Sequence, residues 1–256
     1  MALLEAHNLR MEFGRLVAVD DVSLSIAEGS VHSIIGPNGA GKTTCFNLLT
    51  GKYKPTRGRV IFRGQDITTL PMHRRAHLGI GRSYQITNIF PNLSVLENVR
   101  LAAQALSADR WRWLRPAYTF QPYLKRAYEV IELVGLTAEV ALPGTALAHG
   151  AKRKLELAII LASDPVLLLL DEPTAGMASE QVPELLQTIE RIRREANKTI
   201  VMVEHNMNVV MNISDRITVM HQGALLAEGT PAEITANPQV QQVYLGDLYD
   251  LSEVGT

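Results

Sequence analysis

Short runs rich in hydrophobic residues predict buried strands, and one of them, residues 166–170, is apolar throughout. Three such runs cover residues 30–35, 166–170 and 199–203. Runs without polar alternation are typical of parallel strands, whose two faces are both covered by helices. The chain therefore predicts an α/β fold built on a mainly parallel sheet.

Alternating apolar and polar positions predict a second group of strands near the N-terminus. They cover residues 3–13, 17–26 and 59–62, with no long helical pattern between them. Such alternation is typical of strands that bury one face only. A small antiparallel β layer is therefore expected beside the core, and residues 216–227 predict a late hairpin.

Helical periodicity predicts the elements that cover the sheet. One stripe consists of Leu155, Ala158, Ile159 and Ala162, and a second of Val182, Leu185, Leu186, Ile189 and Ile192. Shorter helices are expected at residues 128–136 and at residues 43–50, where Gly51 supplies the stop. Ser94 with Glu97 forms a capping-box pattern, and Ser179 is a candidate cap for the helix of the second stripe.

Residues 36–43 carry the most specific chemical signal in the chain. They are Gly36, Pro37, Asn38, Gly39, Ala40, Gly41, Lys42 and Thr43, and they fit the phosphate-binding pattern G-x-x-x-x-G-K-[ST]. A predicted strand precedes the pattern and a predicted helix follows it, as the motif requires. Backbone N–H groups at the helix start favour phosphate oxygens, Lys42 adds a positive charge, and the Thr43 hydroxyl suits Mg²⁺. The chain is therefore expected to bind a nucleotide polyphosphate.

Charged residues follow two of the predicted core strands. Asp171 and Glu172 end one strand, and His205 follows another. The carboxyl ends of parallel strands meet at one edge of a sheet, where α/β proteins bind ligands. We expect these three side chains to act together with the phosphate loop.

Composition narrows the class of protein. The chain has 256 residues, of which 46% are hydrophobic, which is enough for a sizeable core. Its formal net charge of −1 provides no basic field for nucleic acid. Cys45 is the single cysteine, so no disulfide can form within the chain, and we expect a small packed residue there rather than a redox switch. No apolar run is long enough to cross a bilayer, and residues 1–5 lack signal-peptide features.

The order and spacing of these motifs resemble those of ATP-binding cassette (ABC) ATPases over residues 3–246. Residues 36–44, ending at Thr44, match the Walker A loop, Gln85 the Q-loop, Asp171 and Glu172 Walker B with its catalytic base, and His205 the switch histidine. Leu147, Ala148, His149 and Gly150 fall at the signature sequence, and Phe13 falls at the aromatic residue that stacks on adenine. The D-loop matches Ala175, Gly176, Met177 and Ala178. The resemblance implies a P-loop NTPase core in a single domain, 1–256, with a helical lobe inserted at about 86–163.

The resemblance also implies a role for each residue. ATP lies between two ATPase subunits in this family, with the signature helix of one subunit facing the ATP of the other. Lys42 and the loop amides would hold the phosphates, and Thr43, Gln85 and Asp171 would arrange Mg²⁺. Glu172 would orient or deprotonate the attacking water, and His205 would stabilise charge on the γ-phosphate.

Finer details look like the ATPases of bacterial branched-chain (hydrophobic) amino-acid importers. They are residues 43–51, the Ala148-His149-Gly150 form of the signature, residues 204–207 and residues 227–246. This likeness implies a second ATPase subunit, two membrane permeases, and a periplasmic or extracellular solute-binding protein, with no nucleic acid. We expect the second ATPase to be a different chain, although the sequence does not decide between a homodimer and a heterodimer. The expected location is peripheral, on the cytoplasmic face of the bacterial inner membrane.

Two residues depart from the family pattern. Ala148 replaces the usual signature serine, and Ala178 replaces the usual acidic or amide residue of the D-loop. Both departures would weaken mainly the ATP site that this chain completes for its partner. We therefore expect unequal sites if the partner is a different ATPase.

Other assignments remain open at this point. The same motifs would serve a translation or DNA-repair ATPase, a lipid or lipopolysaccharide exporter, or a nucleotide-sensing subunit with little hydrolysis. The sequence does not determine the transported solute. Trp111 and Trp113, which lie beside arginines, mark either a partner-docking surface or an ordinary packed helical lobe.

Overall fold

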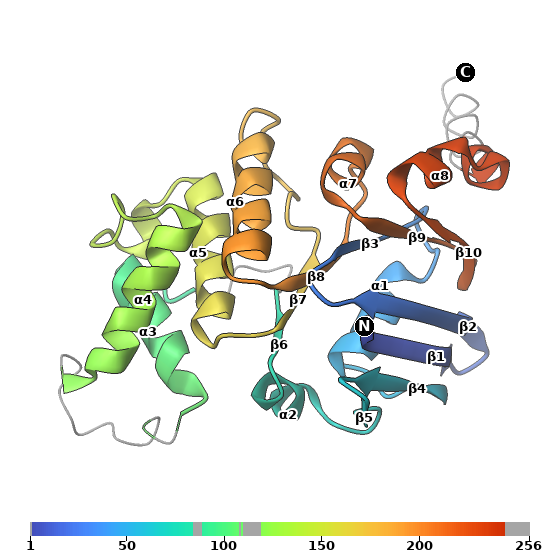
Figure 1. Ribbon diagram of the computed structural model, residues 1–256, viewed down its shortest axis with the longest axis horizontal. Helices are drawn as coiled ribbons and strands as arrows, with labels where there is room; N and C mark the ends of the chain where they lie inside the picture. The colour runs from blue at the N-terminus through green and yellow to red at the C-terminus, as the bar shows by residue number, and fades with distance from the viewer. Residues whose placement is uncertain (1, 84–88, 108, 110–118, 244–256) are drawn as a thin grey trace. The chain divides into compact units, whose positions relative to one another are not determined.

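The chain folds into two compact units, which we describe separately. The computed structural model describes residues 2–83, 89–107, 109 and 119–243 (Figure 1). The first unit combines Met1–Arg75 with Thr199–Thr256, and the second is Ala76–Lys198. The predicted helical lobe, about 86–163, falls inside the second unit, which also contains flanking strands and a further helix. That the whole chain acts as one domain stays a prediction.

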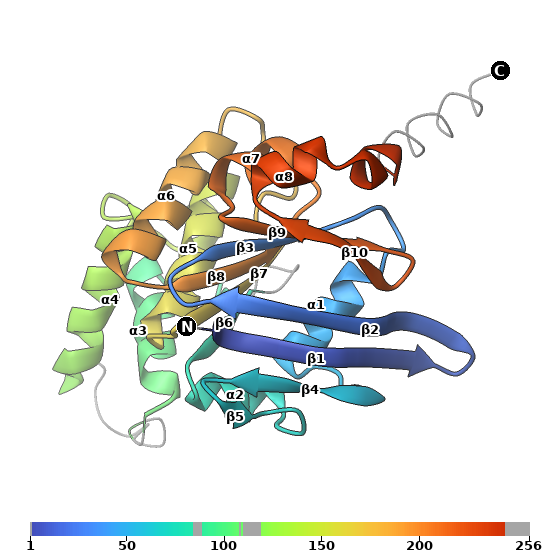
Figure 2. The ribbon, with the colours of Figure 1, turned by 45° about the vertical axis from the view of Figure 1, so that its right-hand side comes forward.

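An antiparallel sheet forms one layer of the first unit (Figure 2). Its strands are β1 (Ala2–Phe13), β2 (Leu16–Ala27), β4 (Arg57–Phe62) and β5 (Gln65–Asp66), in the order β2-β1-β4-β5. Val22, Leu24 and Ile26 in β2 are buried while the serines between them are exposed. The alternating pattern is therefore confirmed as a sheet that buries one face.

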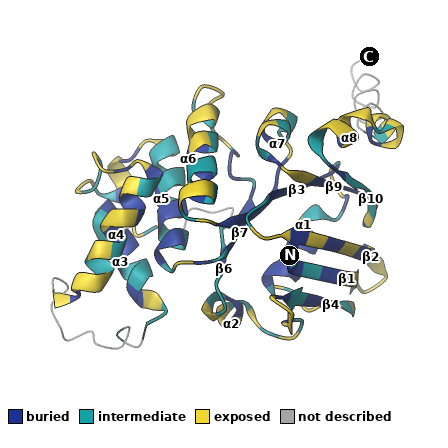
Figure 3. Ribbon diagram, in the orientation of Figure 1, coloured by how far each residue is buried: buried dark blue, intermediate teal, exposed yellow. Residues whose placement is uncertain are grey.

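Parallel strands form the core of the first unit. They are β3 (Val31–Ile35), β8 (Thr199–Val203) and β9 (Arg216–His221), with β10 (Ala224–Gly229) added antiparallel to β9. β3 lies between β8 and β9 and is buried along its whole length (Figure 3). The helices of this unit are α1 (Lys42–Thr50), α7 (Met207–Ile213) and α8 (Pro231–Ala236), and α2 (Met72–His77) spans its boundary. The predicted core strands and the late hairpin are confirmed.

The second unit is mainly helical. Its elements are β6 (Ile80–Arg82), α3 (Val95–Ala105), α4 (Gln121–Val134), the 3₁₀ helix η3 (Gly144–Ala146), α5 (His149–Ala162), β7 (Leu167–Asp171) and α6 (Val182–Glu195). β6 and β7 pair in parallel, and β7 is fully buried. In α5 the buried stripe includes Leu157 and Leu161, while the predicted Ile159 is only half-buried.

The predicted cap of α6 at Ser179 is wrong. The helix begins at Val182, and Gln181 precedes it without a side-chain capping bond. Residues before it form their own turn, in which the Gln181 N–H donates to the Ala178 carbonyl at 2.9 Å. Pro183 lies in the first turn of the helix, where its missing N–H costs nothing. The proline was the more informative signal for the start of this helix.

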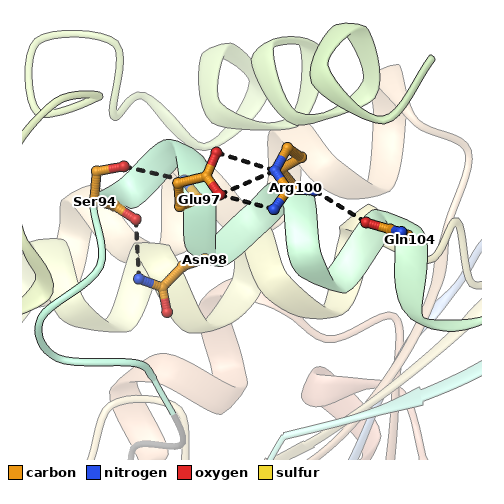
Figure 4. A network of polar contacts seen from close by, with 5 residues as sticks. All are labelled: Ser94, Glu97, Asn98, Arg100 and Gln104. Carbon is orange, nitrogen blue, oxygen red and sulfur yellow. Dashed lines mark hydrogen bonds and ion pairs between the residues drawn. The ribbon is translucent and has the colours of Figure 1, made fainter. Parts of the chain in front are cut away.

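The capping box at α3 is formed only in part (Figure 4). The Ser94 hydroxyl accepts from the Glu97 N–H at 3.2 Å, as predicted. The Glu97 carboxylate, however, accepts two hydrogen bonds of 3.0 Å from Nε of Arg100 and one of 2.8 Å from Nη2. A charged partner one turn away replaces the weaker bond to the backbone that the pattern implies.

Candidate nucleotide site

Two glycines of the phosphate loop are required by the protein's own backbone. A Cβ on Gly36 would lie 2.2 Å from the Met220 carbonyl oxygen, and one on Gly41 would lie 2.4 Å from that of Ala18. Gly41 also has a φ of +92°, a conformation that favours glycine. β2 and β9 therefore fix the loop between β3 and α1, before any ligand is considered.

The start of α1 suits an anion. Gly41 precedes the helix and supplies no side-chain cap for its first N–H groups. The positive end of the helix dipole adds to these donors. Thr43 and Thr44 belong to this first turn, and both line the pocket in front of it.

Lys42 lies folded against its own loop. Its Nζ donates to the carbonyl oxygens of Gly36 at 2.6 Å and Pro37 at 2.9 Å. The ammonium group is thus held beside the loop amides, where a phosphate would meet it.

A pocket of about 530 Å³ opens over the loop, a size that suits a small ligand. It is lined by Leu16, Val17, Ala18, Asn38, Gly39, Ala40, Gly41, Lys42, Thr43, Thr44, Gln222 and Gly223. Sequence reasoning missed the two outer groups, residues 16–18 and 222–223. The Gly223 N–H donates to the Ala40 carbonyl at 3.1 Å, which brings the β9–β10 turn to the loop. Gly223 predicted a turn in the sequence, but nothing in the sequence indicated that this turn lies beside the phosphate loop.

Phe13 lies at the end of β1 and is 44% exposed. Its ring meets that of Tyr53 edge-on, with 5.5 Å between the centroids. An exposed aromatic face suits stacking on a base. The adenine-stacking role of Phe13 stays a prediction.

Arg75 supports the far end of the loop helix, and sequence reasoning missed it. It is 1% exposed, and burial lowers its pKa to about 10. Its guanidinium donates to carbonyls of Leu48 at 3.1 Å and Leu49 at 2.7 Å, in the last turn of α1. It also donates to the carbonyls of Thr68 and Leu70. A buried cation at the negative end of α1 stabilises the helix whose other end forms the loop.

His205 follows β8 in the same unit as the loop. Its side chain is exposed, and its backbone N–H donates to the buried carboxylate of Glu204 at 3.1 Å. The same carboxylate accepts from the Asn206 N–H at 3.3 Å, and Asn206 caps α7. Glu204 therefore fixes the backbone on both sides of the histidine.

Asp171 and Glu172 belong to the second unit. Asp171 ends β7 and is buried; its N–H donates to Ser83 Oγ at 2.8 Å, and Arg82 lies 4.0 Å from its carboxylate. Glu172 follows with a φ of +47°, which non-glycine residues seldom adopt. Backbone strain of this kind gathers at functional sites.

The predicted signature and D-loop residues also lie in the second unit. Ala148 precedes α5 without a side-chain cap, as expected for a residue that lacks a hydroxyl. Leu147 is buried, whereas Ala148 and His149 are exposed. Gly176 has a φ of +75° in the turn-rich segment between β7 and α6.

Comparison with known proteins identifies the family. The ABC transporter profile matches residues 19–175, and the profile of the branched-chain amino acid ATP-binding cassette transporter matches residues 224–250. The chain belongs to the ABC transporter family. It is 42% identical over 250 residues to the high-affinity branched-chain amino acid transport ATP-binding protein LivG of Salmonella typhimurium, covering 96% of this chain and 98% of LivG. It is 40% identical to BraF of Pseudomonas aeruginosa, with the same coverage, and 35% identical to the lipopolysaccharide export system ATP-binding protein LptB of Acidithiobacillus ferridurans, covering 97% and 99%.

Solved ABC cassettes share the fold of this cassette. The ADP conformation of MJ1267, an ATP-binding cassette of an ABC transporter, superposes with a TM-score of 0.85 at 28% identity, covering 96% of this chain and 99% of that one. The dimeric cassette MJ0796 in a post-hydrolysis state with ADP and phosphate gives a TM-score of 0.74 at 28% identity, covering 89% and 98%. The predicted α/β fold with an antiparallel layer is confirmed, and the protein is an ABC ATPase.

The residue chemistry of this cassette fits ATP with Mg²⁺. The Thr43 hydroxyl lines the pocket, and Asp171 supplies a carboxylate; both are the oxygen donors that Mg²⁺ prefers. No cluster of three or more metal-binding side chains occurs among the described residues. Gln85, Trp111 and Trp113 lie outside the described residues.

Cys45 fits the expectation of a packed residue. It is fully buried in α1, and burial raises the pKa of its thiol to about 12. Since the thiolate is the reactive form, such a thiol is inert at neutral pH. Within the part of the chain that is described, no helix combines the length and apolar character needed to span a membrane.

Proposed function

We propose that this cassette is the ATP-hydrolysing subunit of an importer for branched-chain or other hydrophobic amino acids. The observation that carries the proposal is the 42% identity to LivG, which extends over nearly the whole of both chains. The match of residues 224–250 to the branched-chain profile supports it in a segment outside the ATPase motifs.

We assign the binding of ATP to the phosphate loop. The amides of residues 36–44 and the ammonium of Lys42 hold the phosphates, and Phe13 stacks on the adenine. Thr43, Asp171 and Gln85 would hold Mg²⁺, which would neutralise charge on the phosphate oxygens. Lys42 exchanges its two loop carbonyls for phosphate oxygens when ATP enters.

Hydrolysis depends on two further side chains. Glu172 orients or deprotonates the attacking water, and the strained backbone at this residue sets the direction of its carboxylate. His205 stabilises charge developing on the γ-phosphate, from a backbone fixed by Glu204. Phosphoryl transfer is mostly positioning and electrostatics, so these groups suffice without a covalent intermediate.

The cassette is proposed to work in pairs. Leu147, Ala148, His149 and Gly150, with Gly176, Met177 and Ala178, face the ATP held by a second ATPase subunit. Two membrane permeases and a periplasmic or extracellular solute-binding protein complete the assembly. The ATPases lie on the cytoplasmic face of the inner membrane and are held there by the permeases.

Purification from membranes, followed by mass spectrometry of the bound proteins, tests the proposal. Recovery of two permeases and a second ATPase is expected, and the reconstituted assembly should import labelled leucine only with ATP. Ribosomes or DNA in place of permeases would contradict the transport function. The assignment of ATP binding and hydrolysis would be unaffected by that result.

Lipopolysaccharide or lipid export is the second candidate, because LptB shares 35% identity over nearly the whole chain. The same experiment separates the two functions. Copurification with permeases that extract lipid, without leucine uptake, would favour export.

A further inference from the structure

Arg153 joins the signature helix α5 to the D-loop of the same chain. Its Nη2 donates to the Ala175 carbonyl oxygen at 3.1 Å, and its Nη1 donates to Glu156 Oε2 at 2.8 Å. The side chains of Arg153 and Glu156 are each 12% exposed. A largely buried guanidinium therefore holds a backbone carbonyl of the D-loop, entirely within the second unit.

The D-loop is built of turns and belongs to no helix or strand. The Ala175 N–H donates to the Glu172 carbonyl at 3.0 Å, and the Met177 N–H donates to that of Thr174 at 3.2 Å. Gly176 adds a left-handed residue between them. Because short turns give a segment little rigidity, its position depends on contacts from neighbouring elements. Arg153 provides such a contact.

A second close contact, between Gly176 and His149, links the D-loop to the signature helix. A Cβ on Gly176 would lie 3.8 Å from ring atoms of His149, the first residue of α5. The start of the signature helix thus lies beside the D-loop at an exposed residue, while Arg153 joins them one turn further along.

The ion pair between Arg153 and Glu156 is not optimised for stability alone. Arg153 Nε and Glu156 Oε1 are both buried, and neither has a hydrogen-bond partner among the described residues. Leaving buried polar atoms unsatisfied lowers the free energy of unfolding. Such atoms call for an explanation beyond packing.

We propose that Arg153 is a positioning residue that fixes the D-loop to the signature helix, so that both segments meet the partner's ATP as one surface. The inference rests on the proposed function, in which these two segments complete the ATP site of the second ATPase. In this proposal Arg153 acts through the Ala175 carbonyl and not on ATP directly.

The first test is hydrogen–deuterium exchange of the full-length chain carrying Arg153→Met, which removes the donors and keeps an apolar stem. Faster exchange is expected at the amides of residues 174–177, with unchanged exchange at residues 155–162 in α5. Equal exchange in the variant and the wild type would overturn the proposal. This measurement needs no partner and no transport, so it stands apart from the proposed function.

The second test is ATP hydrolysis by the pair of ATPases with Mg·ATP. Arg153→Met is expected to reduce hydrolysis about 10- to 100-fold, as for loss of a hydrogen bond to a charged group. ATP affinity of the single chain should stay within about twofold, because the phosphate loop lies in the other unit. Equal losses of ATP binding and hydrolysis would indicate a general structural role and overturn the proposal. A wild-type pair that hydrolyses ATP without importing amino acids would instead contradict the proposed function.

Lys154→Met is the matched control. Lys154 is the adjacent cation on α5; its side chain is 11% exposed, and its ion pair runs to Glu184 of α6 rather than to the D-loop. We therefore expect exchange at residues 174–177 and hydrolysis both within about twofold of wild type. Arg153→Lys, which keeps one donor for Ala175, should recover part of the lost hydrolysis.

If Arg153→Met does not fold, Glu156→Gln replaces it. This change keeps the arginine and weakens its ion pair, so moderately faster exchange at the amides of residues 174–177 is expected. Unchanged exchange would count against the proposal in the same way.

Discussion

At the scale of single residues, the backbone of Glu172 is the least ordinary feature of the site. Its φ of +47° costs a glutamate about 1–3 kcal/mol. Asp171, the residue before it, is tied to Ser83 through its N–H. We infer that this strain fixes the direction in which the Glu172 carboxylate points.

Glu172→Gln should retain ATP binding and lose about 10²–10⁴ in hydrolysis, because the amide keeps the shape but cannot take a proton. ATP affinity by equilibrium binding and turnover in the coupled assembly measure the two effects. Glu180→Gln, an exposed carboxylate in the turns that follow, is the control and should leave both unchanged. Near-normal turnover of Glu172→Gln would contradict the general-base role.

His32 should make folding sensitive to acid. It is fully buried in β3, with Nε2 2.7 Å from Thr218 Oγ1, and burial lowers its pKa to about 4, with Arg216 lowering it further and Glu228 opposing. The unfolded chain therefore binds a proton at a pH where the folded chain does not. The stability from neutral His32 is complete above about pH 6.5 and is lost as the pH falls toward 4.

Urea unfolding at pH 7 and 4.5 measures this effect. Wild type should lose about 2–3 kcal/mol more between these pH values than His32→Gln does. His7→Gln, at an exposed histidine, is the control and should keep the full pH dependence. The same pH dependence in His32→Gln and wild type would show that His32 is not the group responsible.

At the scale of elements, the sequence predicted best where one pattern determined the result. The strand at residues 199–203 has the predicted bounds, because a fully buried strand is a continuous apolar run. The cap of α6 was placed two residues early, at Ser179 rather than Gln181, because a serine was given more weight than Pro183. Only one of the two predicted capping-box bonds forms, because Arg100 lies one turn beyond Glu97 and binds its carboxylate.

The site was predictable to the extent that its residues are contiguous. The phosphate loop is a single run of sequence, so its start and its helix could be identified in advance. Residues 16–18 and Gly223 line the same pocket from distant segments, and no local pattern specifies such neighbours. Arg75 was missed because a single arginine in a polar helix gives no sign of burial.

Asn98 should be the most sensitive polar residue of α3. It is 2% exposed; its Oδ1 accepts from the Phe90 N–H at 2.7 Å, and its Nδ2 donates to the carbonyls of Phe90, Leu93 and Ser94 (Figure 4 shows the bond to Ser94). Asn98→Ala should lower the free energy of unfolding by about 2–4 kcal/mol, because several backbone groups lose their partner together. Urea denaturation measures the change.

The exposed Asn92, in the segment at residues 90–94 that Asn98 holds, provides the control for Asn98. Asn92→Ala should change the free energy of unfolding by less than about 0.5 kcal/mol. A similarly small change for Asn98→Ala would mean that the segment at residues 90–94 is held by other contacts.

At the scale of the whole molecule, the residues proposed to bind and hydrolyse ATP are divided between two units. Lys42 and His205 belong to the first, whereas Asp171, Glu172 and the signature residues belong to the second. The chain passes from one unit to the other after Arg75 and returns after Lys198. Arg75 thus anchors α1 immediately before the first crossing.

Ala148→Ser should strengthen ATP-dependent pairing of the two ATPases by about 10- to 150-fold, because the hydroxyl adds a hydrogen bond to a phosphate. Pairing constants by analytical ultracentrifugation with ATP measure the effect. Ala146→Ser, at an exposed position just before the signature, is the control and should have no effect. If the partner is a different ATPase, only the site that this chain completes should gain affinity. Equal nucleotide occupancy of the two wild-type sites would count against the predicted asymmetry.

The contacts of Lys42 also bear on which anions the loop rejects. The ammonium already has two carbonyl acceptors, at Gly36 and Pro37. A lone inorganic phosphate or chloride ion must displace them in return for few new contacts, whereas a triphosphate meets the lysine and the loop amides together. A cell contains far more small anions than any one nucleotide. We therefore infer that the two carbonyl contacts of Lys42 favour occupation of the loop by a nucleotide over occupation by small inorganic anions.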